Sequence, residues 1–134
     1  MRNSAIILAG GLSKRFGQDK GLIKLAGKPL INHVLDKISG VVNETVIVVS
    51  SEAQKRAFEN LLKQKARVIV DINNAQSPLV GALTGFENVP NEYSLLLPCD
   101  VPFVSSQITS LLLDLCVNRS AAIPRWPNGF IEPL

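Results

Sequence analysis

Apolar and polar residues along the chain follow two different periods. Short, unbroken apolar runs are typical of strands buried on both faces, and they predict strands at residues 4–8, 45–49, 67–70 and 94–97. A segment with apolar residues every three or four positions follows each run, which predicts helices at residues 29–38, 52–64, 79–87 and from Ser105 or Ser106 to Cys116. A last short strand is predicted at residues 121–123.

This regular alternation of strands and helices is typical of a parallel sheet with helices on both faces. We therefore expect an α/β fold with three layers, αβα, doubly wound around a mostly parallel sheet. The chain has 134 residues, of which 46% are hydrophobic, and this is enough to bury one core. No internal repeat or linker divides the sequence, so residues 1–134 are expected to form a single domain.

Candidate ligand-binding residues follow the predicted strands. In open α/β sheets, ligands bind beyond the carboxyl ends of the strands. Ala9, Gly10 and Gly11 follow the first strand, Asp71 follows the third, and Asp100 follows the fourth. The same edge of the sheet is therefore expected to collect a glycine-containing loop and two carboxylates.

The segment after the first strand combines glycines with cations. Gly10 and Gly11 allow backbone N–H groups to approach a ligand closely, and Lys14, Arg15 and Lys20 supply charged donors, so a polyanion such as a triphosphate is the expected ligand. A tight turn with a solvated charged surface is the alternative. Neither the P-loop spacing nor the dinucleotide fingerprint occurs in the sequence.

The two carboxylates differ in strength as candidates. Asp100 stands between Pro98 and Pro102, which restrict its movement, and Mg²⁺ usually takes one or two protein carboxylates together with phosphate and water oxygens. Asp100 is therefore predicted to bind the metal, with a turn-forming role as the alternative. Asp71 also precedes a polar stretch, so it is a candidate for nucleoside binding or an ordinary loop residue.

Charge and cysteine content exclude several other classes. The net charge is only +3, with seven Lys and Arg against two Asp and Glu in residues 1–40, and no aromatic residues interleave with the cations, so no nucleic-acid partner is expected. Cys99 and Cys116 lack the spacing of a metal site. With no signal peptide and no run of ~20 apolar residues, we expect a soluble, cytoplasmic protein without a membrane partner.

An ordered motif adds a family resemblance. It runs Leu8-Ala9-Gly10-Gly11-x-Ser13-x-Arg15-x-Gly17-x-Asp19-Lys20. This pattern resembles the opening motif of nucleotidyltransferases that join a nucleoside monophosphate to a phosphorylated acceptor. Its Ala-Gly-Gly form, ending in Asp-Lys, is most similar to the molybdenum cofactor guanylyltransferases, as are the segments Gly27-Lys28-Pro29-Leu30 and Cys99-Asp100-Val101-Pro102.

The resemblance implies a Rossmann-like nucleotidyltransferase fold and a specific reaction. GMP would pass from GTP to the terminal phosphate of molybdenum-molybdopterin, with Mg²⁺ as cofactor and pyrophosphate as product. Other molybdenum cofactor biosynthesis proteins or acceptor apoenzymes are the candidate protein partners. The implied catalytic residues are Arg15, Lys20 and Asp100, with Asp100 also the metal ligand. The implied nucleotide-binding residues are Leu8, Ala9, Gly10, Gly11, Lys20, Asp71 and Asp100.

The chain departs from the family pattern in two respects. The family has a Gly-Pro-Leu-x-Gly turn, and Ser77 replaces its first glycine here, which would narrow the site or shift the chain near the base. Family members also continue for several tens of residues, so the domain is expected to lack a C-terminal part. Two alternatives remain open: transfer of another nucleotide to a different phosphorylated acceptor, and a non-catalytic nucleotide-binding module that acts by complexing a partner.

Overall fold

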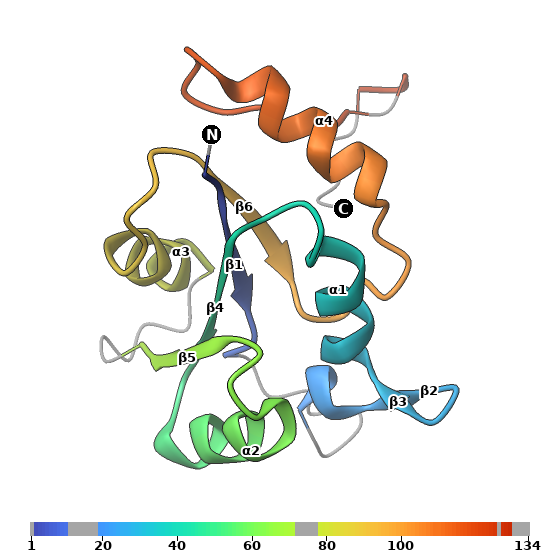
Figure 1. The fold of residues 1–134 in the computed structure, drawn as a ribbon, viewed down its shortest axis with the longest axis vertical. Helices are drawn as coiled ribbons and strands as arrows, with labels where there is room; N and C mark the ends of the chain where they lie inside the picture. Colours follow the sequence, from blue (N-terminus) through green and yellow to red (C-terminus); the bar gives the residue numbers. More distant parts are fainter. Residues whose placement is uncertain (1, 11–18, 72–77, 126, 130–134) are drawn as a thin grey trace.

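The computed structural model describes residues 2–10, 19–71, 78–125 and 127–129. Its central feature is a four-stranded parallel sheet in the order β5-β4-β1-β6 (Figure 1). Leu8, at the end of β1, lies opposite Val48 on one side and Pro98 on the other. The four strands are β1 (Ser4–Leu8), β4 (Glu44–Val49), β5 (Arg67–Val70) and β6 (Ser94–Pro98).

Helices cover both faces of the sheet. The helix α3 (Pro78–Glu87) packs on one face, against β1 and β4. The other face carries α1 (Leu30–Ile38), α2 (Glu52–Leu62) and α4 (Ser106–Cys116) (Figure 1). The three-layer, doubly wound α/β fold predicted from the sequence is therefore confirmed.

Alternating residues of the strands form two separate cores. Ile7, Ile47 and Leu97 face the three-helix side, where they join the apolar residues of α1 and α2. Ile6 and Val46 belong to the second core, on the face that α3 covers. Because β1 and β4, the two central strands, are buried on both faces, the sequence shows continuous apolar runs there instead of an alternating pattern.

Side-chain caps set the beginnings of two helices. The Ser51 hydroxyl accepts a hydrogen bond from the Gln54 backbone N–H at 3.2 Å, and the Ser105 hydroxyl accepts one from Ile108 at the same distance. Both bonds satisfy N–H groups that lack a partner within the helix. Ser105 is thus the cap of α4, and the helix begins at Ser106.

Three short elements lie between β1 and α1. They are the 3₁₀ turn η1 (Lys20–Leu22) and the antiparallel pair β2 (Lys24–Leu25) and β3 (Lys28–Pro29). Gly27, at the turn of this pair, has a φ of 79°, a conformation that glycine adopts without strain. Periodicity did not predict these elements because each is shorter than one apolar repeat.

The last predicted strand is wrong. Residues 121–124 form no strand, and only an isolated bridge occurs beside them, at Arg125. A strand is stable only where its backbone N–H and C=O groups pair with a neighbour, and no strand in the described part of the chain pairs with these residues.

Only some of the apolar residues of α4 face the core. Cys116 is buried, together with Thr109 and Leu113. Ile108, Leu111 and Leu115 are 44%, 54% and 48% exposed, respectively. Because apolar residues surround most of this helix, their spacing did not identify the face that packs on the sheet.

Two glycines of α3 provide a test of how closely this helix approaches β1. A Cβ added at Gly85 would lie 2.4 Å from Cγ2 of Ile6, whereas one at Gly81 would meet the flexible end of Leu8 at 3.3 Å. We expect Gly85→Ala to lower the free energy of unfolding by about 1–3 kcal/mol, as overpacking does. Gly81→Ala is the control and should change it by less than ~1 kcal/mol. Equal urea midpoints for the two variants would contradict the packing.

Candidate functional site

The predicted site residues that the structure describes lie along one edge of the sheet, at or near the carboxyl ends of the strands. Leu8 ends β1, and the backbone N–H of Ala9 donates to the carbonyl of Val48 at 2.9 Å. The hydroxyl of Ser50, which follows β4, donates to the carbonyl of Gly10. The chain leaving β1 is therefore held against β4. Gly11 and Arg15 lie outside the described residues.

Lys20 and Asp100 approach each other at this edge. Lys20 begins η1, Asp100 follows β6, and Nζ of the lysine is 3.7 Å from Oδ2 of the aspartate. The two side chains are 51% and 37% exposed, respectively. Solvent screens such a pair, so it adds little to stability and leaves both charges accessible to a ligand.

Packing of η1 on the core places Lys20 beside Asp100. Gly21 is buried, and a Cβ added there would lie 3.1 Å from the ring of Phe58 and 3.4 Å from Cβ of Cys99. These are tight contacts, so even a methyl group there would require the Phe58 ring or η1 to shift by a few tenths of an ångström. Cys99 immediately precedes Asp100, so this contact brings the two charged residues into the same region.

Asp71 lies at the same edge but on a different strand end. Its backbone N–H donates to the carbonyl of Val49 at 2.8 Å, and the Thr84 hydroxyl of α3 is 3.2 Å from its Oδ1. Three strand spacings separate β5 from β6, about 14 Å. Asp71 and Asp100 therefore suit two different parts of an extended ligand better than one shared ion.

Sequence reasoning missed two polar side chains that shape this edge. Thr84 approaches Asp71, as described above, and Gln54 is only 6% exposed and donates to Asp19 at 2.7 Å. A signal for Gln54 did exist, because it stands four residues before Phe58 on the buried face of α2. A glutamine at such a position needs buried hydrogen-bond partners.

The carboxylates at this edge could hold a divalent ion only with help from other ligands. Within the described ranges, no group of three or more His, Cys, Asp or Glu side chains is arranged to hold a metal. Mg²⁺ does not require such a group, since one carboxylate suffices when phosphate and water oxygens complete the octahedron. The partly exposed carboxylate of Asp100 fits an ion that arrives with a phosphate ligand.

Cys99 gives the protein a specific pH dependence. Burial, with a smaller contribution from Asp100, raises the pKa of its thiol from 9.0 to about 11. The unfolded chain loses this proton near pH 9 and the folded chain near pH 11, so the unfolded state binds fewer protons between these values. The contribution of the Cys99 thiol to the free energy of unfolding is therefore fully present below pH 9 and is lost as the pH rises toward 11.

We expect the fall due to Cys99 to be about 2–3 kcal/mol, the equivalent of a two-unit difference in pKa. Urea unfolding without divalent metal, at pH 8 and at higher values up to 11, would measure it. Other groups also titrate in this range, so the Cys99→Ala variant is the reference, and the wild type should lose the additional stability. Parallel pH profiles for the two proteins would contradict this account.

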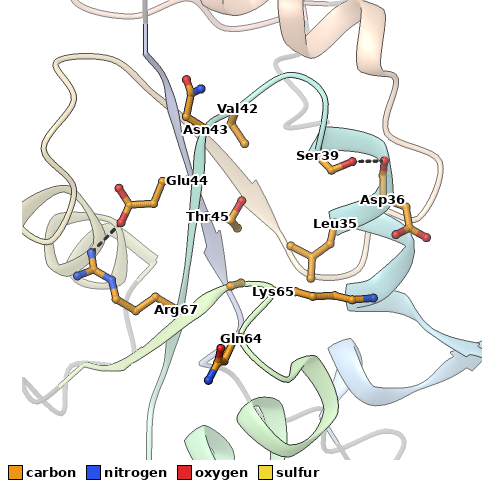
Figure 2. A pocket seen from close by; sticks show the side chains of 11 residues that line it. Leu35, Asp36, Ser39, Val42, Asn43, Glu44, Thr45, Gln64, Lys65 and Arg67 are labelled. Atoms are coloured by element: carbon orange, nitrogen blue, oxygen red, sulfur yellow. Dashed lines mark hydrogen bonds and ion pairs between the residues drawn. The ribbon is translucent and has the colours of Figure 1, made fainter.

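A pocket of about 490 Å³ lies at the opposite end of the sheet (Figure 2). Its lining includes Glu44 and Arg67, from the amino ends of β4 and β5, whose side chains form an ion pair at 3.3 Å. None of the predicted site residues that the structure describes lines it. It thus lies away from the edge at which sheets of this kind bind ligands.

In the described part of the chain, no helix has the length and apolar character needed to cross a membrane.

Fold and site together define a doubly wound α/β domain that carries Gly10, Lys20 and two carboxylates at the carboxyl edge of a parallel sheet, the edge at which ligands bind in such domains. Comparison with known proteins identifies the family. The chain belongs to the MobA-like NTP transferase domain family, whose model matches residues 5–134.

Relatives and solved structures agree with this assignment. The chain is 32% identical to a probable molybdenum cofactor guanylyltransferase of Bacillus cereus, over 99% of this chain and 66% of the relative. It is 34% identical to one of Methanosarcina acetivorans, over 98% and 61%. The crystal structure of molybdopterin-guanine dinucleotide biosynthesis protein A from Archaeoglobus fulgidus is similar with a TM-score of 0.74 and 25% identity, over 98% of this chain and 64% of that one. The chain thus spans somewhat less than two thirds of the length of these relatives.

Proposed function

We propose that the protein takes part in a nucleotidyl transfer in which GMP passes from GTP to the terminal phosphate of molybdenum-molybdopterin. The observation that carries this proposal is the 3.7 Å approach of Lys20 to Asp100, next to the chain that leaves β1. A cation and a carboxylate at one accessible point suit a ligand that combines phosphate with a divalent ion. The names of the relatives support the choice of guanine nucleotide and pterin acceptor.

The reaction requires orientation and charge neutralisation more than covalent chemistry. An oxygen of the acceptor phosphate forms a bond to the α-phosphorus of GTP, and the bond from that phosphorus to the bridging oxygen breaks. Pyrophosphate leaves with the electron pair. The attacking oxygen is already anionic, so no protein base is needed.

Five of the site residues have a defined role in this proposal. The Lys20 ammonium group neutralises negative charge on the phosphate oxygens, and Ala9 and Gly10 bring backbone close to the triphosphate. Asp71, at the far strand end, is assigned to the nucleoside. Asp100 would hold Mg²⁺, which when bound supplies additional positive charge to the phosphates.

Isothermal titration of GTP, ATP and CTP into the purified chain, with and without Mg²⁺, tests the proposal. GTP should bind most tightly and should need the metal. The metal-dependent binding should be lost in Asp100→Ala. Asp36→Asn, which removes an exposed carboxylate that pairs with Lys28 outside the site, is the control and should leave binding unchanged. Equal binding of all three nucleotides would contradict the guanylyl assignment. Nucleotide binding without pyrophosphate release at any supply of acceptor would instead favour a non-catalytic binding module.

A further inference from the structure

Gln54 uses both ends of its buried side chain amide. Oε1 accepts a hydrogen bond from the backbone N–H of Ser50 at 2.8 Å, and Nε2 donates to Oδ1 of Asp19 at 2.7 Å. The chemistry of the partners determines the orientation of the amide, because a backbone N–H only donates and an ionised carboxylate only accepts. With 6% of its surface exposed, Gln54 depends on these partners to offset its loss of water.

Both partners of Gln54 connect to the candidate site. Asp19 immediately precedes Lys20, and its carbonyl accepts from Leu22 in η1 at 3.1 Å. Ser50 donates its hydroxyl hydrogen to the carbonyl of Gly10. A continuous series of hydrogen bonds therefore runs from Gly10 through Ser50 and Gln54 to Asp19.

Capping of α2 does not account for this arrangement. The cap uses the backbone N–H of Gln54 and the hydroxyl of Ser51, so it needs no glutamine side chain. Apolar contacts do not account for it either, because the amide reaches across 35 positions of sequence to a carboxylate next to the site. The side chain instead joins the chain that leaves β1 to the chain that enters η1.

We propose that Gln54 is a positioning residue that fixes Asp19, and through it Lys20, relative to Gly10. This inference rests on the proposed function, since the distance between Gly10 and Lys20 determines how the two can hold one triphosphate. Gln54 acts on the ligand only through these neighbours. Misplacement of a catalytic group by about 1 Å can cost ~10²-fold in rate, so a partial loss of this bridge should lower kcat measurably.

The test is an exchange of hydrogen-bond roles between positions 54 and 19. Gln54→Glu has nearly the same shape and retains the bond from Ser50, but at pH 8 it places a second carboxylate against Asp19. We expect kcat for pyrophosphate release to fall about tenfold or more. Adding Asp19→Asn supplies an amide that can donate to the new carboxylate, and the double variant should recover most of the loss. Gln107→Glu, an exposed position of α4, is the matched control and should retain wild-type kcat.

Amide hydrogen exchange without nucleotide measures the same bridge independently of activity. The backbone N–H groups of Leu22 and Ile23 bond to Asp19 and Lys20 at 3.1 and 3.2 Å. Gln54→Glu should speed their exchange and leave that of Lys63, at the end of α2, unchanged. Asp19→Ala removes the acceptor from a loop position, so it gives the same measurement if the substitution on α2 prevents folding.

Wild-type kcat and wild-type exchange in Gln54→Glu would overturn the inference, as would a double variant no more active than the single one. A uniform increase in exchange through α2 would show a general structural role and would also overturn it. Absence of nucleotide binding by the wild type would refute the proposed function instead. The exchange measurement would then still decide whether Gln54 holds Asp19.

Discussion

Lys20→Ala is expected to lower the rate of nucleotidyl transfer by ~10²–10³, the usual effect of removing one preorganised group that stabilises developing charge. The Lys20 ammonium group lies 3.7 Å from the Asp100 carboxylate at the carboxyl edge of the sheet, where the phosphates are proposed to bind. Without it, negative charge on the phosphate oxygens would have to be balanced by water, which must reorganise as the charge moves. Pyrophosphate release measured with saturating GTP and acceptor tests this result.

The same substitution should hardly change stability. Both partners of the ion pair are more than one third exposed to solvent, which screens their interaction, so its loss should alter the free energy of unfolding by less than ~1 kcal/mol. Lys24→Ala is the control, because it removes an exposed lysine from the neighbouring β2 strand. A loss of less than about tenfold in Lys20→Ala, or an equal loss in the control, would contradict the role of Lys20.

Asp100→Asn is the second large effect, with an expected loss of ~10²–10³ in transfer rate. Asparagine has nearly the same size as aspartate but carries no charge, so it binds a hard divalent cation less well. The concentration of Mg²⁺ needed for half-maximal rate should therefore rise together with the loss. Rates measured over a series of Mg²⁺ concentrations separate a weakened metal site from a general defect.

The control for this variant is Asp114→Asn, which removes an exposed carboxylate from α4. It should preserve both the rate and the Mg²⁺ requirement. If Asp100→Asn lowered the rate while its Mg²⁺ dependence stayed that of the wild type, the carboxylate would have to act on Lys20 or on substrate, and its assignment as metal ligand would be wrong.

Local sequence pattern predicted the strands and helices well where the apolar signal was strong. The β1 run occupies residues 4–8 as expected, and β5 occupies residues 67–70. In β1 every residue is buried or half-buried, so each contributes to the signal, and β5, at the edge of the sheet, still has three consecutive apolar β-branched residues after the exposed Arg67. The predicted strand at residues 121–123 is wrong because a short apolar run does not show whether a partner strand is available.

For the candidate site, the sequence predicted which edge of the sheet bears the residues but not how far apart they lie. Strand endings placed Gly10, Asp71 and Asp100 at one edge, because parallel strands present their carboxyl ends together. Spacing could not reveal that Lys20 and Asp100 approach to 3.7 Å, or that Asp71 leaves the sheet three strands away from Asp100. Those relations depend on strand order, which pattern alone does not specify.

The sequence by itself determined the fold class, the edge that bears the ligand-binding residues, and the family resemblance that the comparison with known proteins supports. Each of these follows from local periodicity or from residues close together in the chain. Only the tertiary structure decided the strand order, the buried face of α4, and the bridge from Gln54 to Asp19. These depend on contacts between residues far apart in sequence, which form only when the chain packs as a whole and which no local pattern encodes.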